Sequence, residues 1–108
     1  MSYNVLTIPP FDRQLKRLIK KYPSLKVEIR DLGDLLAQNP TYGTPLQNSC
    51  FKIRISIKSK GRGKSGGARI ITHTRVTKNE VFLLSIYDKS EKVNITDSEP
   101  NYFLDQIN

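Results

Sequence analysis

The chain has 108 residues, of which 37% are hydrophobic and 26% are charged, and its formal net charge at pH 7 is +8. This composition excludes a disordered protein, and no apolar run has the length of a membrane span or of the core of a secretion signal. The lone Cys50 excludes an internal disulfide and is expected to be a small packed residue. We therefore expect one cytoplasmic domain over residues 1–108.

The positive charge is concentrated in one part of the chain. Residues 35–79 contain no Asp or Glu but nine Lys and Arg, whereas the other residues comprise nine basic and ten acidic ones. The nine are Lys52, Arg54, Lys58, Lys60, Arg62, Lys64, Arg69, Arg75 and Lys78. Because like charges repel, such a block is typical of a surface that binds a polyanion, and nucleic acid is the favoured partner.

The N-terminal half predicts a strand followed by two helices. Residues 3–8 alternate apolar and polar side chains and end at two prolines, as in a short strand. Residues 11–22 then place apolar side chains three or four positions apart, which predicts a helix with one apolar face. Ser24 is the predicted N-cap of a second helix that ends at Asn39. The tight connection predicts a helical hairpin.

The C-terminal half changes to the period of a strand. Residues 40–49 have the Pro, Gly and Asn content of a loop, and strict alternation over 51–58 predicts a strand with one buried face. The pattern then predicts, in chain order, a basic glycine-rich loop at 59–67, a strand at 68–76, a turn at 77–80, a strand at 81–87 and a short final helix opened by Thr96 and Glu99.

These elements follow in the order β-α-α-β-β-β-α, which predicts an α+β fold. We expect an antiparallel sheet of about four strands, with the N-terminal helical hairpin on one face. The strand at 81–87 is apolar on both faces, so it is expected in the interior of the sheet.

Alternation along the strands also predicts which side chains share the other face of the sheet. The residues expected there, from two neighbouring strands, are Lys52, Arg54, Lys58, Arg69, His73 and Arg75. We expect this face to be concave and open, with the glycine-rich loop at its rim and with Tyr87 and Lys89 within reach. The alternative is a merely solvated face, since strands often carry lysines outward.

Several kinds of catalytic site are disfavoured by the residues themselves. The segment 63–65 (Gly-Lys-Ser) lacks the first glycine of a phosphate-binding loop, because Lys58 occupies that position. His73 is the only histidine, which excludes a ribonuclease mechanism with two histidines. The acids nearest the basic face, Glu80 and Asp88, make a poor Mg²⁺ site among so many cations. We therefore expect neither a metal nor another cofactor.

Three segments, in this order, resemble the RelE/HigB family of bacterial toxins: 50–54 (CFKIR), 66–71 (GGARII) and 82–91 (FLLSIYDKSE). The helical hairpin ending in Asn39-Pro40 is similar as well, so the resemblance covers nearly the whole chain. The long basic segment 59–67 looks more like the HigB-type branch of the family.

The resemblance implies a toxin of a type II toxin-antitoxin system. Such a toxin is a ribosome-dependent endoribonuclease that cuts mRNA in the decoding site and is silenced by a cognate antitoxin. It acts without a metal, and it contacts DNA only indirectly, through the antitoxin complex. The 2′-hydroxyl of the preceding nucleotide attacks the phosphodiester, and basic side chains and a tyrosine take the place of histidines.

The resemblance also implies roles for particular residues. Lys52 is the first candidate for the general base, and Lys89 for stabilising charge or protonating the leaving oxygen. Arg69, helped by Arg54, is expected to stabilise the charge that develops on the phosphate, and Tyr87 to stack on a base or assist proton transfer. The set expected to bind RNA is Arg54, Lys58, Lys60, Arg62, Lys64, His73 and Arg75.

The chain departs from the family pattern at two positions. Arg54 stands where the best-studied type has a second lysine, and Arg does not readily act as a base. Ile95 stands where that type has a late tyrosine. Two alternatives to the enzyme therefore stay open: a non-catalytic basic module that binds nucleic acid on the same scaffold, and a subunit whose basic face docks an acidic protein.

Overall fold

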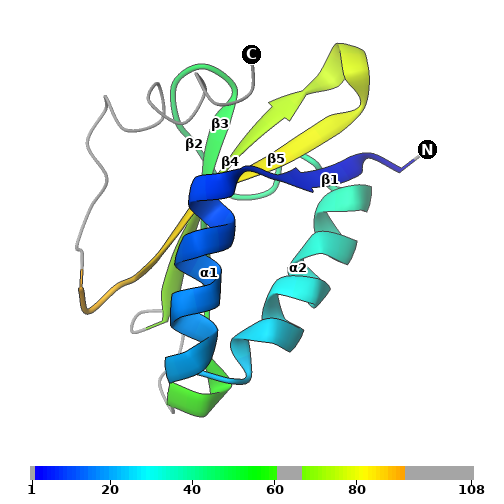
Figure 1. The fold of residues 1–108 in the computed structure, drawn as a ribbon. Coiled ribbons are helices and arrows are strands. Elements are labelled where there is room, and N and C mark those ends of the chain that lie inside the picture. Colours follow the sequence, from blue (N-terminus) through cyan, green and yellow to red (C-terminus); the bar gives the residue numbers. More distant parts are fainter. Residues whose placement is uncertain (1, 61–66, 92–108) are drawn as a thin grey trace.

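The computed structural model describes residues 2–60 and 67–91. Its helices and strands are, in chain order, β1 (Asn4–Thr7), α1 (Pro9–Lys21), α2 (Leu25–Gln38), β2 (Thr44–Pro45), β3 (Cys50–Ile55), β4 (Ala68–Arg75) and β5 (Glu80–Asp88). Short 3₁₀ helices lie at Lys58–Lys60 and Val76–Lys78. The predicted α+β fold is confirmed (Figure 1). The predicted final helix at 96–107 lies outside the described residues.

The predicted helical hairpin is present, and α1 and α2 lie side by side across one face of the sheet (Figure 1). The two prolines that end the strand pattern, Pro9 and Pro10, form the first turn of α1, where a missing N–H costs no hydrogen bond. The apolar stripes are buried against the sheet at Phe11 and Leu18 of α1 and at Leu25, Leu32 and Leu36 of α2. No helix in the described part of the chain is long and apolar enough to cross a membrane.

The sheet has five strands in the order β1-β5-β4-β3-β2. Strand β5 is interior, as its apolar residues predict. The sheet is mixed rather than antiparallel throughout, because β1 pairs in parallel with β5 through Val5 opposite Val81. The fifth strand, β2, is only two residues long and lies within the predicted loop, where it pairs with Phe51 and Lys52.

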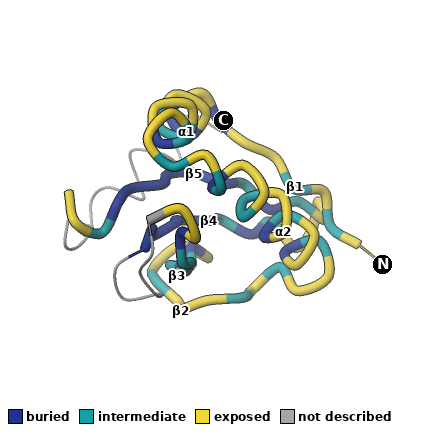
Figure 2. Tube along the Cα trace, turned by 90° about the horizontal axis from the view of Figure 1, so that it is seen from below, coloured by how far each residue is buried: buried dark blue, intermediate teal, exposed yellow. Residues whose placement is uncertain are grey.

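The pairing of residues across the strands shows which side chains share each face of the sheet. Ile53, Ile70 and Ile86 are paired across β3, β4 and β5 and are almost fully buried. Asp88, on the same face, accepts a hydrogen bond of 2.9 Å from the hydroxyl of Tyr22 at the end of α1. We call this the inner face, because the helices cover it (Figure 2). The opposite side of the sheet is the outer face.

A cluster of polar contacts fixes the corner where α1, α2 and the end of β3 meet. Ser24 precedes α2, but its side chain makes no capping bond; its hydroxyl donates to Glu28 and accepts from the backbone N–H of Ser59. Glu28 in turn accepts a 2.7 Å bond from the backbone N–H of Lys58. Ser24 is therefore the N-cap residue of α2, as predicted, although it caps without a side-chain bond. The predicted continuation of β3 to Lys58 is wrong, since these contacts turn the chain after Ile55.

Candidate active site

A row of three side chains crosses the outer face of the sheet. Arg54 of β3 is the direct partner of Arg69 of β4, and Arg69 is the direct partner of Tyr87 of β5. Because directly opposite residues of antiparallel strands share a face, the three side chains are neighbours. Lys52 lies in the next row, opposite Ile71. The structure thus brings together Arg54, Arg69 and Tyr87, which we call the basic row, and Lys52 lies beside this row.

The basic row is less open than the sequence suggests. Arg69 has only 5% of its surface exposed and Tyr87 only 7%, while Lys52 is half-buried and Arg54 exposed. The expectation of an open face is therefore wrong at the centre, because Arg69 lies on an interior strand between large side chains of both neighbouring strands. Burial lowers the pKa of Arg69, the charge of Arg54 lowers it further, and Tyr87 opposes the shift. The Arg69 guanidinium also donates to the carbonyl oxygen of Ala68 at 3.2 Å.

Lys89 follows β5 directly, in a segment that is held at several points. Its backbone N–H donates to the carbonyl oxygen of Gly67 at 3.0 Å. The buried carboxylate of Asp88 accepts from the backbone N–H and the hydroxyl of Ser90, at 3.0 and 2.9 Å, as well as from Tyr22. These bonds place Lys89 at the end of β5, two residues beyond Tyr87, as the sequence predicts.

Gly67 explains why a glycine precedes the buried arginine in the segment 66–71 (GGARII). A Cβ atom at this position would lie 2.0 Å from the carbonyl oxygen of Ile55 and 2.9 Å from the Cα of Ser56. Only glycine permits this approach of the two backbones. The approach sets the start of β4, and with it the register that places Arg69 opposite Arg54.

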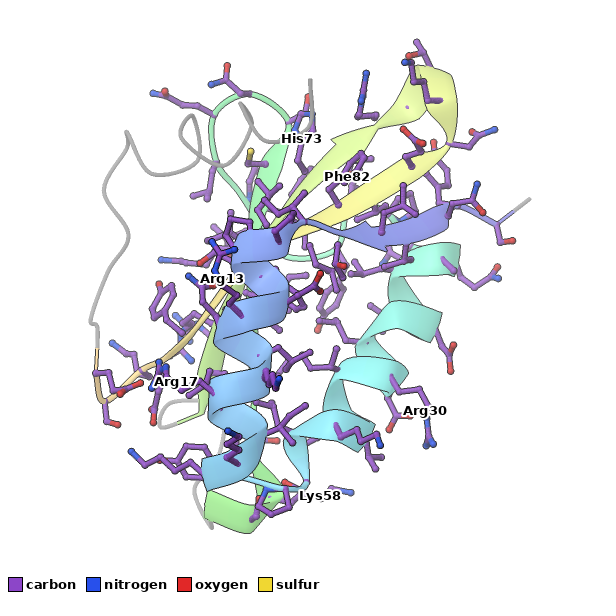
Figure 3. The ribbon with its side chains drawn as sticks, in the orientation of Figure 1. Arg13, Arg17, Arg30, Lys58, His73 and Phe82 are labelled. Carbon is purple, nitrogen blue, oxygen red and sulfur yellow. The ribbon has the colours of Figure 1, made fainter. Side chains whose placement is uncertain are left out.

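The other residues of the predicted RNA-binding set are not all in this row. Lys58 is exposed but lies at the bottom of the view beside the helical hairpin (Figure 3), because its backbone is bonded to Glu28. Arg75 is on the outer face but forms an ion pair with Glu80 at 4.0 Å. Lys60 is the last residue of the 3₁₀ helix that follows β3. Arg62 and Lys64 lie outside the described residues.

Sequence reasoning missed a depression next to Lys52. It has a volume of about 380 Å³ and is lined by Tyr42, Gly43, Thr44, Lys52, Ile53 and Arg54. Gly43 has a φ of +113°, and a Cβ there would lie 2.8 Å from the carbonyl oxygen of Lys52. The glycine in the predicted loop was the available signal, since glycine is the usual residue at such positive φ angles. The depression gives Lys52 and Arg54 a common recess.

The two acidic residues of β5 are not available to the basic row, because one is ion-paired and the other is buried on the inner face. Glu80 pairs with Arg75, and Asp88 lies on the inner face, where it is fully buried. Within residues 2–60 and 67–91, no group of three or more His, Cys, Asp and Glu side chains is placed to hold a metal ion. The geometry is therefore that of a cationic surface with a tyrosine, suited to binding and polarising a phosphodiester.

Cys50 is fully buried, as expected of a small packed residue, and burial raises the pKa of its thiol to about 11. At pH 8 only about one thiol in a thousand is then ionised, and the thiolate is the form that reacts. We expect iodoacetamide to label the folded protein very slowly at pH 8 and rapidly in denaturant. Because Cys50 is the only cysteine, mass spectrometry of the intact chain reports on this site alone. Rapid labelling of the folded protein would contradict the burial.

Comparison with known proteins relates this architecture to toxins. Residues 37–106 match the family model described as RelE toxin of the RelE/RelB toxin-antitoxin system. The E. coli toxin RelE, solved as a mutant in the free state, aligns with a TM-score of 0.58 and 17% identity over 98% of this chain and 94% of that chain. The RelBE2 toxin-antitoxin complex of Mycobacterium tuberculosis aligns with a TM-score of 0.62 and 19% identity over 82% of this chain and 99% of that chain.

A metal-bound toxin from Helicobacter pylori also aligns, with a TM-score of 0.50 and 19% identity over 83% of this chain and 98% of that chain. At such identities the solved structures show the shared fold. The family match spans more than half of the chain and includes β3, β4, β5 and the whole basic row. The chain belongs to the RelE toxin family.

Proposed function

We propose that this toxin is an endoribonuclease that cuts mRNA on the ribosome and so stops translation. The observation that carries the proposal is the basic row, in which two arginines and a tyrosine are direct cross-strand neighbours, with Lys52 beside them and Lys89 at the strand end. In a member of the RelE family, this arrangement supplies the charges and the proton carriers that RNA cleavage needs.

The proposed reaction is a transfer within the RNA strand. The 2′-oxygen bonds to the adjacent phosphorus while the bond from phosphorus to the 5′-oxygen breaks, which leaves a 2′,3′-cyclic phosphate and a 5′-hydroxyl. Lys52 takes the proton of the 2′-hydroxyl, and Lys89 stabilises or protonates the leaving 5′-oxygen. Arg69 and Arg54 neutralise the charge that builds up on the non-bridging oxygens, since a guanidinium fork matches two of them. The side chains do this without a metal ion.

We also propose an antitoxin as the protein partner of this chain and the cytoplasm as its site of action. The RelBE2 relative is described as a toxin-antitoxin complex, and the basic row here offers a surface for an acidic segment of such a partner. The basic segment 59–67 supports assignment to the HigB-type branch, and contact with DNA would be indirect, through the antitoxin.

The proposal is tested by controlled expression in bacteria, with primer extension on a pair of reporter mRNAs that differ only in their start codon. We expect growth arrest and new 5′ ends on the translated reporter alone. Cuts on both reporters would show a nuclease independent of the ribosome. Neither arrest nor cuts, with the protein soluble and folded, would favour the non-catalytic module that binds nucleic acid.

A further inference from the structure

A second row of side chains crosses the same outer face, and the proposed reaction does not use it. Cys50 of β3 pairs with His73 of β4, His73 pairs with Phe82 of β5, and Phe82 pairs with Leu6 of β1. His73 and Phe82 are half-buried, and Leu6 is 37% exposed. Figure 3 labels His73 and Phe82 on neighbouring strands, at the end of the sheet opposite Lys58. Two aromatic rings and an aliphatic side chain therefore line one strip of this face.

An irregularity in β5 places Phe82 on this face. The pairing of β4 with β5 shifts between Ile71 and Thr72: Ile71 is opposite Ser85, but Thr72 is opposite Leu83, so Leu84 is an extra residue. Without it, strict alternation from Tyr87 would direct Leu83 to the outer face and Phe82 to the helices. Bulges of this kind often re-aim a side chain next to a functional site. Here the bulge places a large aromatic ring on the outer face, opposite His73, instead of on the face that the helices cover.

The His73 ring is held by a strained turn. Asn48 and Ser49 both have a φ of 58°, which is uncommon for residues other than glycine. The ring lies beside the backbone of both residues, and its Nδ1 lies 3.8 Å from the Cys50 sulfur. Burial lowers the pKa of His73, the nearby Arg75 lowers it further, and the two backbone contacts oppose the shift. A neutral, fixed ring presents a stacking surface, and its single N–H would hold a phosphate less strongly than the charged form.

The spacing of the two rows suits one RNA strand. His73 lies four residues along β4 from Arg69, which corresponds to about 13 Å at the rise of a β-strand. Lys52 stands in the row between them. Cations that track a backbone, interleaved with aromatic side chains that stack bases, are the usual features of a surface for single-stranded nucleic acid.

We propose that His73 and Phe82 form a stacking platform for the bases of the single-stranded RNA whose phosphate lies at the basic row. The inference rests on the proposed function and adds to it a base-binding subsite on the neighbouring part of the sheet. Because stacking is tolerant of sequence, the platform holds the strand in register rather than reading a particular base. The ligand is single-stranded RNA with its bases unpaired.

The test measures the binding of a fluorescent 2′-O-methyl hexanucleotide, which has no free 2′-hydroxyl, and of an abasic strand of equal length and charge. We expect the wild-type chain to prefer the strand with bases by about 5- to 150-fold, the range that one stacked base contributes. Phe82→Leu keeps an apolar side chain without a ring and should remove most of that preference. Phe82→Tyr should retain it. The affinity for the abasic strand should be the same in all three proteins, which shows that the variants are folded.

Two results would overturn the platform: equal affinity of the wild-type chain for the two strands, or an undiminished preference in Phe82→Leu. Neither result bears on the nuclease, which is scored separately by the cuts on translated message. Conversely, if the chain preferred the strand with bases but cut no translated message, the platform would be supported and the proposed cleavage reaction would be contradicted. The two failures are thus distinguishable.

Discussion

Arg69→Ala is expected to reduce mRNA cleavage by about 10²- to 10³-fold, the usual cost of removing one donor aimed at charge developing in a transition state. The physical reason is the position of the guanidinium. Arg69 has only 5% of its surface exposed and lies at the centre of the basic row, with Arg54 opposite it on β3 and Tyr87 opposite it on β5. A phosphate at this position would be bound in a partly desolvated place, where electrostatic interactions are stronger than in water.

The fold should survive this substitution. Two guanidinium groups directly opposite each other on neighbouring strands destabilise the sheet, so removing one relieves a repulsion that offsets part of the lost packing. Arg69→Lys separates charge from geometry, because lysine keeps the charge but lacks the planar fork. We expect Arg69→Lys to recover only part of the activity. Thermal unfolding of each purified variant checks that the chain is folded.

Arg30→Ala is the matched control. Arg30 is exposed on α2, and within the described residues its ion pair is with its neighbour Asp31 at 3.5 Å (Figure 3). Primer extension on the translated reporter should show wild-type cuts for Arg30→Ala and strongly reduced cuts for Arg69→Ala. Full cleavage by a folded Arg69→Ala protein would show that the basic row is not the active site. Loss of cleavage in both variants would point to a nonspecific effect of reduced positive charge.

The parts of the fold that follow from local pattern could be predicted from the sequence, and those that depend on distant pairing could not. The alternation over residues 51–58 identifies β3 and its two faces. The sequence around β1 does not show that this strand pairs in parallel with β5, because the paired residues, such as Val5 and Val81, are far apart in the sequence. The end of β3 depends equally on Glu28, which binds the backbone of Lys58 from a helix thirty residues earlier.

The candidate site shows the same division between what local pattern predicts and what only strand pairing reveals. Alternation alone put Arg54 and Arg69 on one face, and the register makes them direct partners. Phe82 was missed because β5 is apolar on both faces, so its sequence does not reveal the bulge at Leu84 that changes which side chains face the helices. Arg75 was predicted as an RNA contact from its face alone, but the ion pair with Glu80 is visible only once the strands are paired.

Gly67→Ala is expected to lower the free energy of unfolding by about 3 kcal/mol or more. The new Cβ would lie 2.0 Å from the carbonyl oxygen of Ile55, and the contact is with backbone rather than with a flexible side chain. The strands β3 and β4 would have to separate at the start of their pairing, next to Arg69. Denaturant unfolding followed by circular dichroism gives the free energy directly.

Gly33→Ala provides the same chemical change with the opposite expected sign. Gly33 lies inside α2, and a Cβ there would meet nothing within 4 Å. Alanine should therefore raise the free energy of unfolding by about 0.5–1 kcal/mol, because glycine in a helix loses more backbone entropy on folding. If Gly67→Ala left the free energy of unfolding unchanged while Gly33→Ala raised it as expected, β3 and β4 would not approach each other as closely as described.

Gly67→Ala should also impair cleavage, since the Gly67 carbonyl oxygen accepts the backbone hydrogen bond that positions Lys89. Stability and active-site geometry therefore depend on the same close approach.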